Sequence, residues 1–264
     1  MIMEVLYIRN MLRFNRKKEI QFISMVEGIE ETMPILPMSE YRYDWLKKAG
    51  DKIKERKKNL ADWNKSNSTL KCPAMLTFRN KGFILRAPWD IHLTIESENS
   101  YKWRTSIGNE NVAKDLTETV THHNEDLFFN FMSSWPKDTM EIVLKLNLPW
   151  AMRIPKGYEV LMVEPFYKDD CRFTTCSGVF DSDLGIARLT VPIMWHSTKG
   201  SYIIKTGTPI AQLIPVKKDT ITHQNLNLVT DKKFKRDDAL TYIKMTESFN
   251  TNYDKVKKFL RGKI

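Results

Sequence analysis

The stretch from Met140 to Val216 constrains the fold most, because it is a succession of short runs rich in β-branched and aromatic residues. Proline and glycine turn signals separate the runs, which are Met140–Leu148, Tyr158–Glu164, Phe173–Thr175, Ala187–Met194, Tyr202–Lys205 and Ile210–Val216. Short runs with this spacing are typical of an antiparallel barrel or sandwich. We therefore predict a mainly β protein.

Strand-like patterns also occur earlier in the chain. Met3–Arg9 and Ile20–Val26 alternate apolar and polar residues, which predicts a strand in each. Gly82–Glu96 contains two short strand-like runs around Pro88, and Glu98–Trp103 predicts a hairpin tip with its return strand. The sequence predicts β structure from Cys72 onward.

Basic helices are predicted on both sides of the β region. Ser39 is a suitable N-cap for a lysine-rich helix that begins near Glu40. Residues 237–260 combine apolar side chains with many lysines, which predicts one or two amphipathic helices. The predicted organisation is an N-terminal strand and helix extension over 1–70, a β domain over 71–218 and a C-terminal helical extension over 219–264.

The net charge of +10 and the pI near 9.3 favour partners that are polyanions, such as nucleic acid or nucleotides. The alternative is that the lysines serve solubility alone. No apolar run approaches the roughly 20 residues needed to span a bilayer, and no signal-peptide pattern is present, so the chain is predicted to be cytoplasmic. Cys72, Cys171 and Cys176 contain no C-x-x-C pair and are predicted to be reduced thiols.

Four segments resemble, in order along the chain, the motifs of the dUTPase and dCTP deaminase family. Gly178–Gly185 is similar to the Gly-Val-Ile-Asp motif of that family, and Gly207–Ile214 to its Gly-x-x-Ile-Ala-Gln-Leu strand. Leu144–Pro165 resembles the strand, turn and strand that lead to its Pro-Arg-Ser-Gly motif, and Ala87–Leu93 its early Gly-Tyr-Asp-Leu motif. The resemblance implies a dUTPase-like β-clip core and a homotrimer.

A second resemblance covers the whole arrangement. The segments Pro37–Lys47, Cys72-Pro73, Asp90–Leu93 and Trp135-Pro136 are similar to those of an uncharacterised group of tailed-phage proteins. This resemblance implies a phage origin, and therefore the cytoplasm of a host cell, but no activity.

The family resemblance implies positions for nucleotide chemistry. Asp181 matches the aspartate that holds the sugar and activates the attacking water, and Asp90 matches the aspartate that meets Mg²⁺ through water. A carboxylate pair of this kind could hold Mg²⁺. Asp183 falls within the same motif as Asp181 and Gln212 within the Gly207–Ile214 motif, and both are candidate ligand-binding residues.

Other positions depart from the family pattern. Leu184 replaces the tyrosine that stacks on the deoxyribose, Phe166–Asp170 replaces the Arg-Ser-Gly phosphate donors, and the glycine-rich C-terminal arm is absent. Because such donors supply much of the rate in phosphoryl transfer, their loss argues against catalysis. Lys168 or Arg172 could take the place of the missing arginine.

Simpler roles remain open for several of these residues. Asp181 and Asp183 are also good turn residues, Gln212 could satisfy a backbone group between strands, and His196 is more readily a surface histidine than a metal ligand. His122 and His123 are rejected as a metal site, since neighbouring side chains point to different sides of a regular element.

Three hypotheses for function follow. The first is a phage-encoded, non-catalytic dUTPase-like protein that binds a nucleotide, a nucleic acid or a host factor. The second is a Mg²⁺-dependent pyrophosphatase acting on a deoxynucleoside triphosphate. The third is a structural or decoration protein of the virion.

Overall fold

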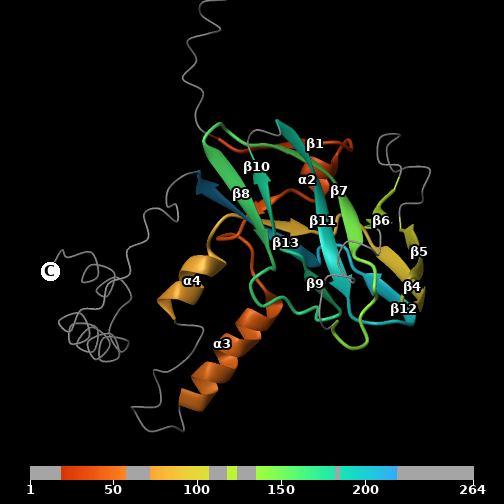
Figure 1. The fold of residues 1–264 in the computed structure, drawn as a ribbon. Coiled ribbons are helices and arrows are strands. Elements are labelled where there is room, and N and C mark those ends of the chain that lie inside the picture. Colours follow the sequence, from red (N-terminus) through yellow and green to blue (C-terminus); the bar gives the residue numbers. More distant parts are fainter. Residues whose placement is uncertain (1–18, 58–71, 107–117, 124–134, 182–184, 219–264) are drawn as a thin grey trace, which may run out of the picture. The chain divides into compact units, whose positions relative to one another are not determined.

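The computed structural model describes residues 19–57, 72–106, 118–123, 135–181 and 185–218. The described residues belong to two compact units: those from 19 to Met38 and those between Gly82 and Lys218 belong to one, and those between Ser39 and Lys81 belong to the other. Figure 1 shows the elements in sequence colours. The predicted strand Met3–Arg9, the predicted C-terminal helices and Asp183 lie outside the described residues.

The first sheet is built around two long antiparallel strands, β7 (Leu144–Arg153) and β11 (Ile186–Trp195). β1 (Gln21–Ser24) and β6 (Val120–His122) pair with β7, and β9 (Phe173–Thr175) pairs with β11. The pairing of β7 with β11 shifts register between Arg188 and Thr190, as at a β-bulge.

The second sheet has the order β10–β8–β13–β3–β2, with β13 (Pro209–Lys217) in its centre. The other strands are β10 (Gly178–Asp181), β8 (Tyr158–Val163), β3 (Phe83–Arg86) and β2 (Leu36–Pro37). Gly82 precedes β3 with a φ of +72°, and a Cβ there would lie 1.8 Å from the carbonyl oxygen of Leu213. Only glycine therefore permits β3 to approach β13 as it does.

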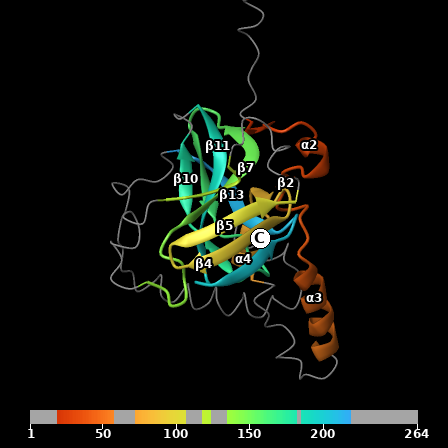
Figure 2. The same ribbon diagram turned by 90° about the vertical axis from the view of Figure 1, so that its right-hand side faces the viewer.

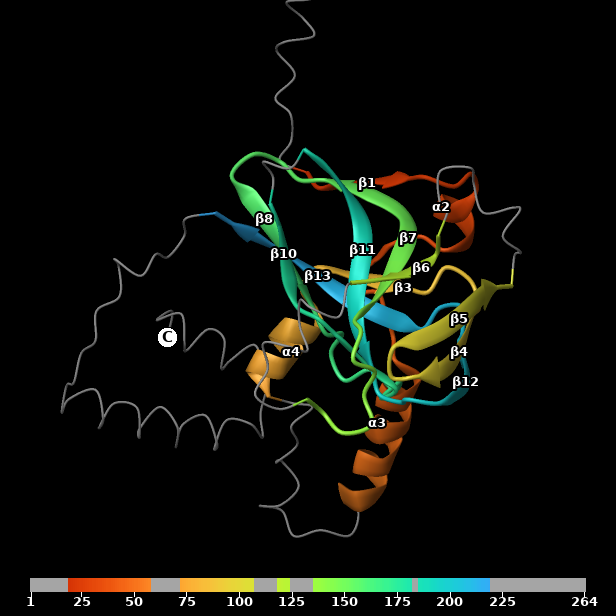
Figure 3. The same cartoon turned by 45° about the vertical axis from the view of Figure 1, so that its right-hand side comes forward.

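The third sheet contains β12 (Gly200–Ile204), β4 (Ile91–Ser97) and β5 (Ser100–Thr105), in that order. Figures 2 and 3 show β4 and β5 side by side as a hairpin. The two strands pair His92 with Arg104 and Thr94 with Lys102.

Strand alternation explains how one core forms among these sheets. In β4, Ile91, Leu93 and Ile95 are buried while the residues between them are partly or fully exposed. The largest fully buried side chains, Trp195 and Phe173, stack with nearly parallel rings 6.1 Å apart. In the described residues most strands appear where the sequence predicts them and form three antiparallel sheets, so the predicted mainly β fold is confirmed.

The helical predictions are partly wrong. The basic N-terminal helix exists as α3 (Asp44–Lys57), but it begins at Asp44, so Ser39 is not its N-cap. The chain is also not β immediately after Cys72, because α4 (Pro73–Arg79) is helical and has its proline in the first turn, where the missing N–H costs nothing. A further short helix, α2 (Ile29–Thr32), follows Gly28. No helix in the described part of the chain is long and apolar enough to cross a membrane.

Candidate functional site

Asp90 lies between β3 and β4, and its carboxylate is fully engaged by one loop. Its Oδ2 accepts a hydrogen bond from Lys205 Nζ at 2.8 Å, and its Oδ1 accepts bonds from the backbone N–H and the hydroxyl of Thr206 at 2.8 and 2.9 Å. The Lys205 ammonium first, and then the Thr206 donors, hold the pKa of Asp90 far below its usual value. The carboxylate therefore ties the start of β4 to the loop between β12 and β13.

Asp181 ends β10 and forms an ion pair with Lys218 Nζ, which comes directly after β13. Its side chain is 42% exposed and that of Lys218 is 19% exposed. The sequence matches Asp181 to a catalytic base, and here the carboxylate lies within hydrogen-bonding reach of a lysine of its own chain.

Asp90 and Asp181 lie toward opposite ends of the central strand β13. Asp90 contacts Thr206, just before β13, whereas Asp181 pairs with Glu159, which in turn pairs with Val216. The strand from Pro209 to Val216 alone spans roughly 23 Å at the usual rise per residue. One chain therefore does not bring the two predicted carboxylates together.

This separation bears on the predicted Mg²⁺ site. Mg²⁺ needs closely arranged oxygen ligands in octahedral geometry, and both oxygens of Asp90 are already held by Lys205 and Thr206. Across the residues that the structure describes, no group of three or more His, Cys, Asp or Glu side chains could hold a metal ion. The described residues of one chain thus do not fit the Mg²⁺ that the resemblance implies.

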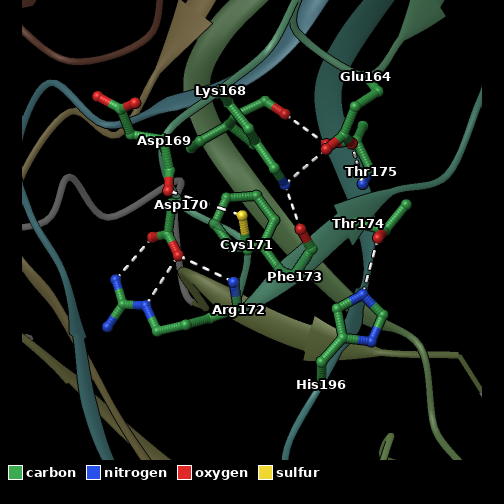
Figure 4. A network of polar contacts seen from close by, with 11 residues as sticks. Glu164, Lys168, Asp169, Asp170, Cys171, Arg172, Phe173, Thr174, Thr175 and His196 are labelled. Atoms are coloured by element: carbon green, nitrogen blue, oxygen red, sulfur yellow. Dashed lines mark hydrogen bonds and ion pairs between the residues drawn. The ribbon is translucent and has the colours of Figure 1, made fainter. Parts of the chain in front are cut away.

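Lys168 lies in the segment between β8 and β9, where the resemblance predicts phosphate donors. Its side chain is only 5% exposed, and its Nζ pairs with Glu164 Oε1 at 2.8 Å and donates to the carbonyl of Phe173 (Figure 4). The ammonium also lies 3.5 Å from the centre of the Phe173 ring. Burial lowers the pKa of Lys168, although Glu164 acts in the opposite direction. Binding of a phosphate by Lys168 would require these internal contacts to break.

Arg172, at the end of the same segment, has a similar arrangement. Its Nε and Nη2 donate to the two oxygens of Asp170 at 2.8 and 2.6 Å (Figure 4). Nη2 also donates to the carbonyl of Ile203 in β12. The hydrogen bonds to Asp170 raise the pKa of Arg172. Lys168 and Arg172 therefore lie in the same segment, and the bonds that each makes within the chain hold that segment in its folded position.

Gln212 and His196 also have internal positions. Gln212 is completely buried in β13, between Ile84 of β3 and Val163 of β8. His196 is half-buried, and its Nδ1 and Nε2 lie 3.0 and 2.7 Å from the hydroxyls of Thr139 and Thr174. Burial lowers the pKa of His196, which agrees with a neutral ring between two hydroxyl groups.

A candidate surface that the sequence prediction missed is the outer face of β12–β4–β5. Two rows cross this sheet: Ile203, His92 and Arg104 form one, and Ser201, Thr94 and Lys102 form the other. These side chains border a hollow of about 310 Å³, and no carboxylate among the described residues lines it. We call this face, with His92, Thr94, Lys102, Arg104 and Ser201, the basic sheet face.

Neighbouring polar groups on this sheet bond to one another and to Lys102. Glu96 pairs with Lys102 at 2.5 Å and accepts a hydrogen bond from Ser100, while the hydroxyls of Thr94 and Ser201 lie 3.3 Å apart. Arg104 and Lys102 are both exposed and stand two residues apart on one strand, roughly 7 Å. The face thus presents Arg104, Lys102 with its Glu96 partner, and hydroxyl donors; guanidinium, ammonium and hydroxyl groups bind phosphate oxygens.

Comparison with known proteins gives only structural matches. No protein-family model and no curated protein matches the chain. A mutant dUTPase from phage phi11 of S. aureus matches with 15% identity and a TM-score of 0.29, over 57% of this chain and 84% of that one. A dUTPase mutant of Staphylococcus bacteriophage 80alpha matches with 12% identity and a TM-score of 0.33, over 81% of this chain and 98% of that one. Because these identities and TM-scores are low, no function is transferred from those proteins to this chain.

Proposed function

We propose that this chain is a non-catalytic dUTPase-like protein that binds single-stranded nucleic acid through the basic sheet face. The observation that carries the proposal is the hollow bordered by His92, Lys102 and Arg104, with the hydroxyls of Thr94 and Ser201 beside them. Guanidinium, ammonium and hydroxyl groups bind phosphate oxygens, and the net charge of +10 favours approach by a polyanion.

A single strand fits this surface better than a duplex. The hollow is small, and the next side chains of the same strand, Tyr101 and Trp103, offer aromatic rings on the opposite side of β5. Proteins that bind single strands combine a basic groove for the backbone with aromatic rings for the bases. Both features here belong to β5 (Ser100–Thr105).

The positions of the predicted catalytic groups support a binding function over hydrolysis. Asp90 and Asp181 each bond to a lysine of the same chain and lie toward opposite ends of β13. A pyrophosphatase of the dUTPase type would have to combine them from different subunits of an oligomer, such as the trimer that the resemblance implies. Turnover of any deoxynucleoside triphosphate with Mg²⁺, abolished by Asp181→Asn, would establish that alternative and refute the non-catalytic proposal.

The phage origin, the trimer, a host protein partner and a place in the virion remain predictions from the resemblance. Light scattering on the purified chain would determine the oligomeric state, and mass spectrometry of purified particles would reveal a virion component. Binding of nucleic acid is compatible with every outcome of these two measurements, so it needs a test of its own.

The test is equilibrium binding of a labelled, unstructured oligo(dT) strand, measured by fluorescence anisotropy. We expect Lys102→Gln/Arg104→Gln to weaken binding by roughly tenfold at moderate salt, since each cation neutralises one phosphate. The matched control is Lys137→Gln/Lys156→Gln, which removes the same charge from exposed residues outside the hollow. Equal affinities of the two double variants would refute the proposal, since net charge alone would then explain binding.

A further inference from the structure

A second hollow lies on the other side of β5, where that strand faces β6. It has a volume of about 530 Å³ and includes Tyr101 and Trp103 of β5 and Glu118, Thr121 and His122 of the β6 segment. A volume of this size is in the range of small-molecule sites. We call it the aromatic groove.

The groove combines aromatic walls with a few fixed polar groups. Tyr101 and Trp103 are partly buried against the core, and the rings of Tyr101 and His122 meet edge to face at 5.8 Å. The Tyr101 hydroxyl lies 3.1 Å from His122 Nδ1. Flat rings with one polar side are suited to a planar heterocycle, because bases stack on aromatic side chains regardless of their sequence.

Glu118 is the only acid among the described residues of the groove, and its backbone is held in place. The amide of Asn147 in β7 donates to the Glu118 carbonyl at 2.8 Å, and the Asn147 N–H donates to the Thr119 carbonyl at 2.9 Å. Burial, and then the nearby Glu118 carboxylate, raise the pKa of Tyr101 to about 12, so the phenol stays protonated. A carboxylate on a fixed backbone beside aromatic rings can accept hydrogen bonds but cannot donate them.

From this arrangement we infer that the aromatic groove binds a nucleobase, with Glu118 selecting guanine. Guanine presents two adjacent donors, N1–H and the N2 amino group, to one carboxylate. Adenine places an acceptor nitrogen beside its amino group, and that lone pair is repelled by the carboxylate. Inosine's base keeps N1–H but lacks the amino group, so it should rank between them.

This inference deepens the proposed function, since a base in the aromatic groove would belong to the strand whose phosphates occupy the basic sheet face. The two surfaces lie on opposite sides of β5 and share Trp103. Phosphate contacts give affinity without sequence information, whereas contacts to a base edge give specificity. Loss of phosphate binding and loss of base selectivity can therefore be measured separately.

The test compares GMP, IMP and AMP binding to the full chain by calorimetry or by NMR titration. These ligands share one phosphate, so differences among them report the base. We expect GMP to bind roughly tenfold more tightly than AMP, the effect of one good two-point contact, with IMP between. In Glu118→Gln the preference for GMP should disappear, while in the charge-matched control Glu27→Gln it should persist; both replaced side chains are exposed.

Separate outcomes identify which idea fails. Equal binding of the three nucleotides, or a GMP preference that survives in Glu118→Gln, would overturn the inference about the groove. Lys102→Gln/Arg104→Gln should weaken all three nucleotides alike and leave their ratios unchanged. If oligo(dT) binding does not depend on Lys102 and Arg104 but the GMP preference depends on Glu118, the proposed function fails and the base site stands.

Discussion

Replacement of Lys168 by methionine tests whether the segment between β8 and β9 is a structural anchor or a phosphate site. Methionine keeps most of the apolar stem of a side chain that is 5% exposed, so the change removes chiefly the ammonium, whose Nζ lies 2.8 Å from Glu164 Oε1. A net hydrogen bond that involves a charged group is worth about 1.5–3 kcal/mol, and the ammonium makes two such bonds, to Glu164 and to the Phe173 carbonyl. Relief of the desolvation cost of a buried ammonium offsets part of this sum.

We therefore expect Lys168→Met to lower the free energy of unfolding by about 2 kcal/mol. With a urea m-value of about 2 kcal/mol/M, the midpoint of unfolding should fall by about 1 M. Glu164→Gln/Lys168→Met should lose less than the sum of the single changes, with a coupling of about 1 kcal/mol, because the two side chains contact each other. Lys156→Met, at an exposed lysine, is the control and should leave the midpoint unchanged.

The same variant separates the two roles considered for Lys168. A buried lysine that serves to bind phosphate would cost desolvation energy in the free protein. Its replacement would then leave the free energy of unfolding unchanged or raise it, and would weaken nucleotide binding. Unchanged stability together with weaker nucleotide binding would show that the Lys168 contacts drawn in Figure 4 do not anchor the segment.

Three further predictions concern single positions. Lys205 and Thr206 lower the pKa of Asp90 from 3.8, so its carboxylate stabilises the folded chain above pH 3.8, and this stabilisation is lost as the pH falls through the lowered pKa. Asp90→Asn should therefore reduce the melting temperature at neutral pH and not at strongly acidic pH. An equal reduction at both pH values would contradict this. Gly82→Ala should prevent stable folding because its Cβ would meet the Leu213 carbonyl, whereas Gly157→Ala, with a similar φ of +82° but open space, should cost about 1–2 kcal/mol by chemical denaturation. Asp181→Asn should cost less than about 1 kcal/mol by the same assay, since its ion pair with Lys218 is partly exposed and such pairs contribute little; a larger loss would show that the pair is a main support of β10.

Much of the β structure could be predicted because alternation and turn residues are local signals. The runs at Phe83–Arg86, Ile91–Ser97 and Tyr158–Val163 all form strands near the predicted bounds. β6 was missed since three residues give too short a pattern, and it is a strand through its pairing with β7. α4 was missed because its apolar residues also suit a strand, and the decisive signal was Pro73 at the helix start.

The candidate site was harder to predict, because it depends on strand order. Motif likeness selected Asp90 and Asp181, but only the central place of β13 shows that they lie toward its two ends. The pairing of Lys102 with Thr94 could have been found from the predicted hairpin around Glu98. The pairing of Ser201 with Thr94 could not have been found in this way, since no local signal places β12 beside β4.

The salt dependence of oligo(dT) binding is the sharpest test of the basic sheet face as a nucleic-acid site, because it counts the phosphates that the chain neutralises. For a single strand, the logarithm of the binding constant falls with the logarithm of salt concentration with a slope of about −0.7 for each phosphate neutralised. If Lys102 and Arg104 each hold one phosphate, Lys102→Gln/Arg104→Gln should make the slope shallower by about 1.4, and Lys137→Gln/Lys156→Gln should leave it as in the unmodified chain. A slope that is the same in all three proteins would contradict the assignment of the basic sheet face as the nucleic-acid site.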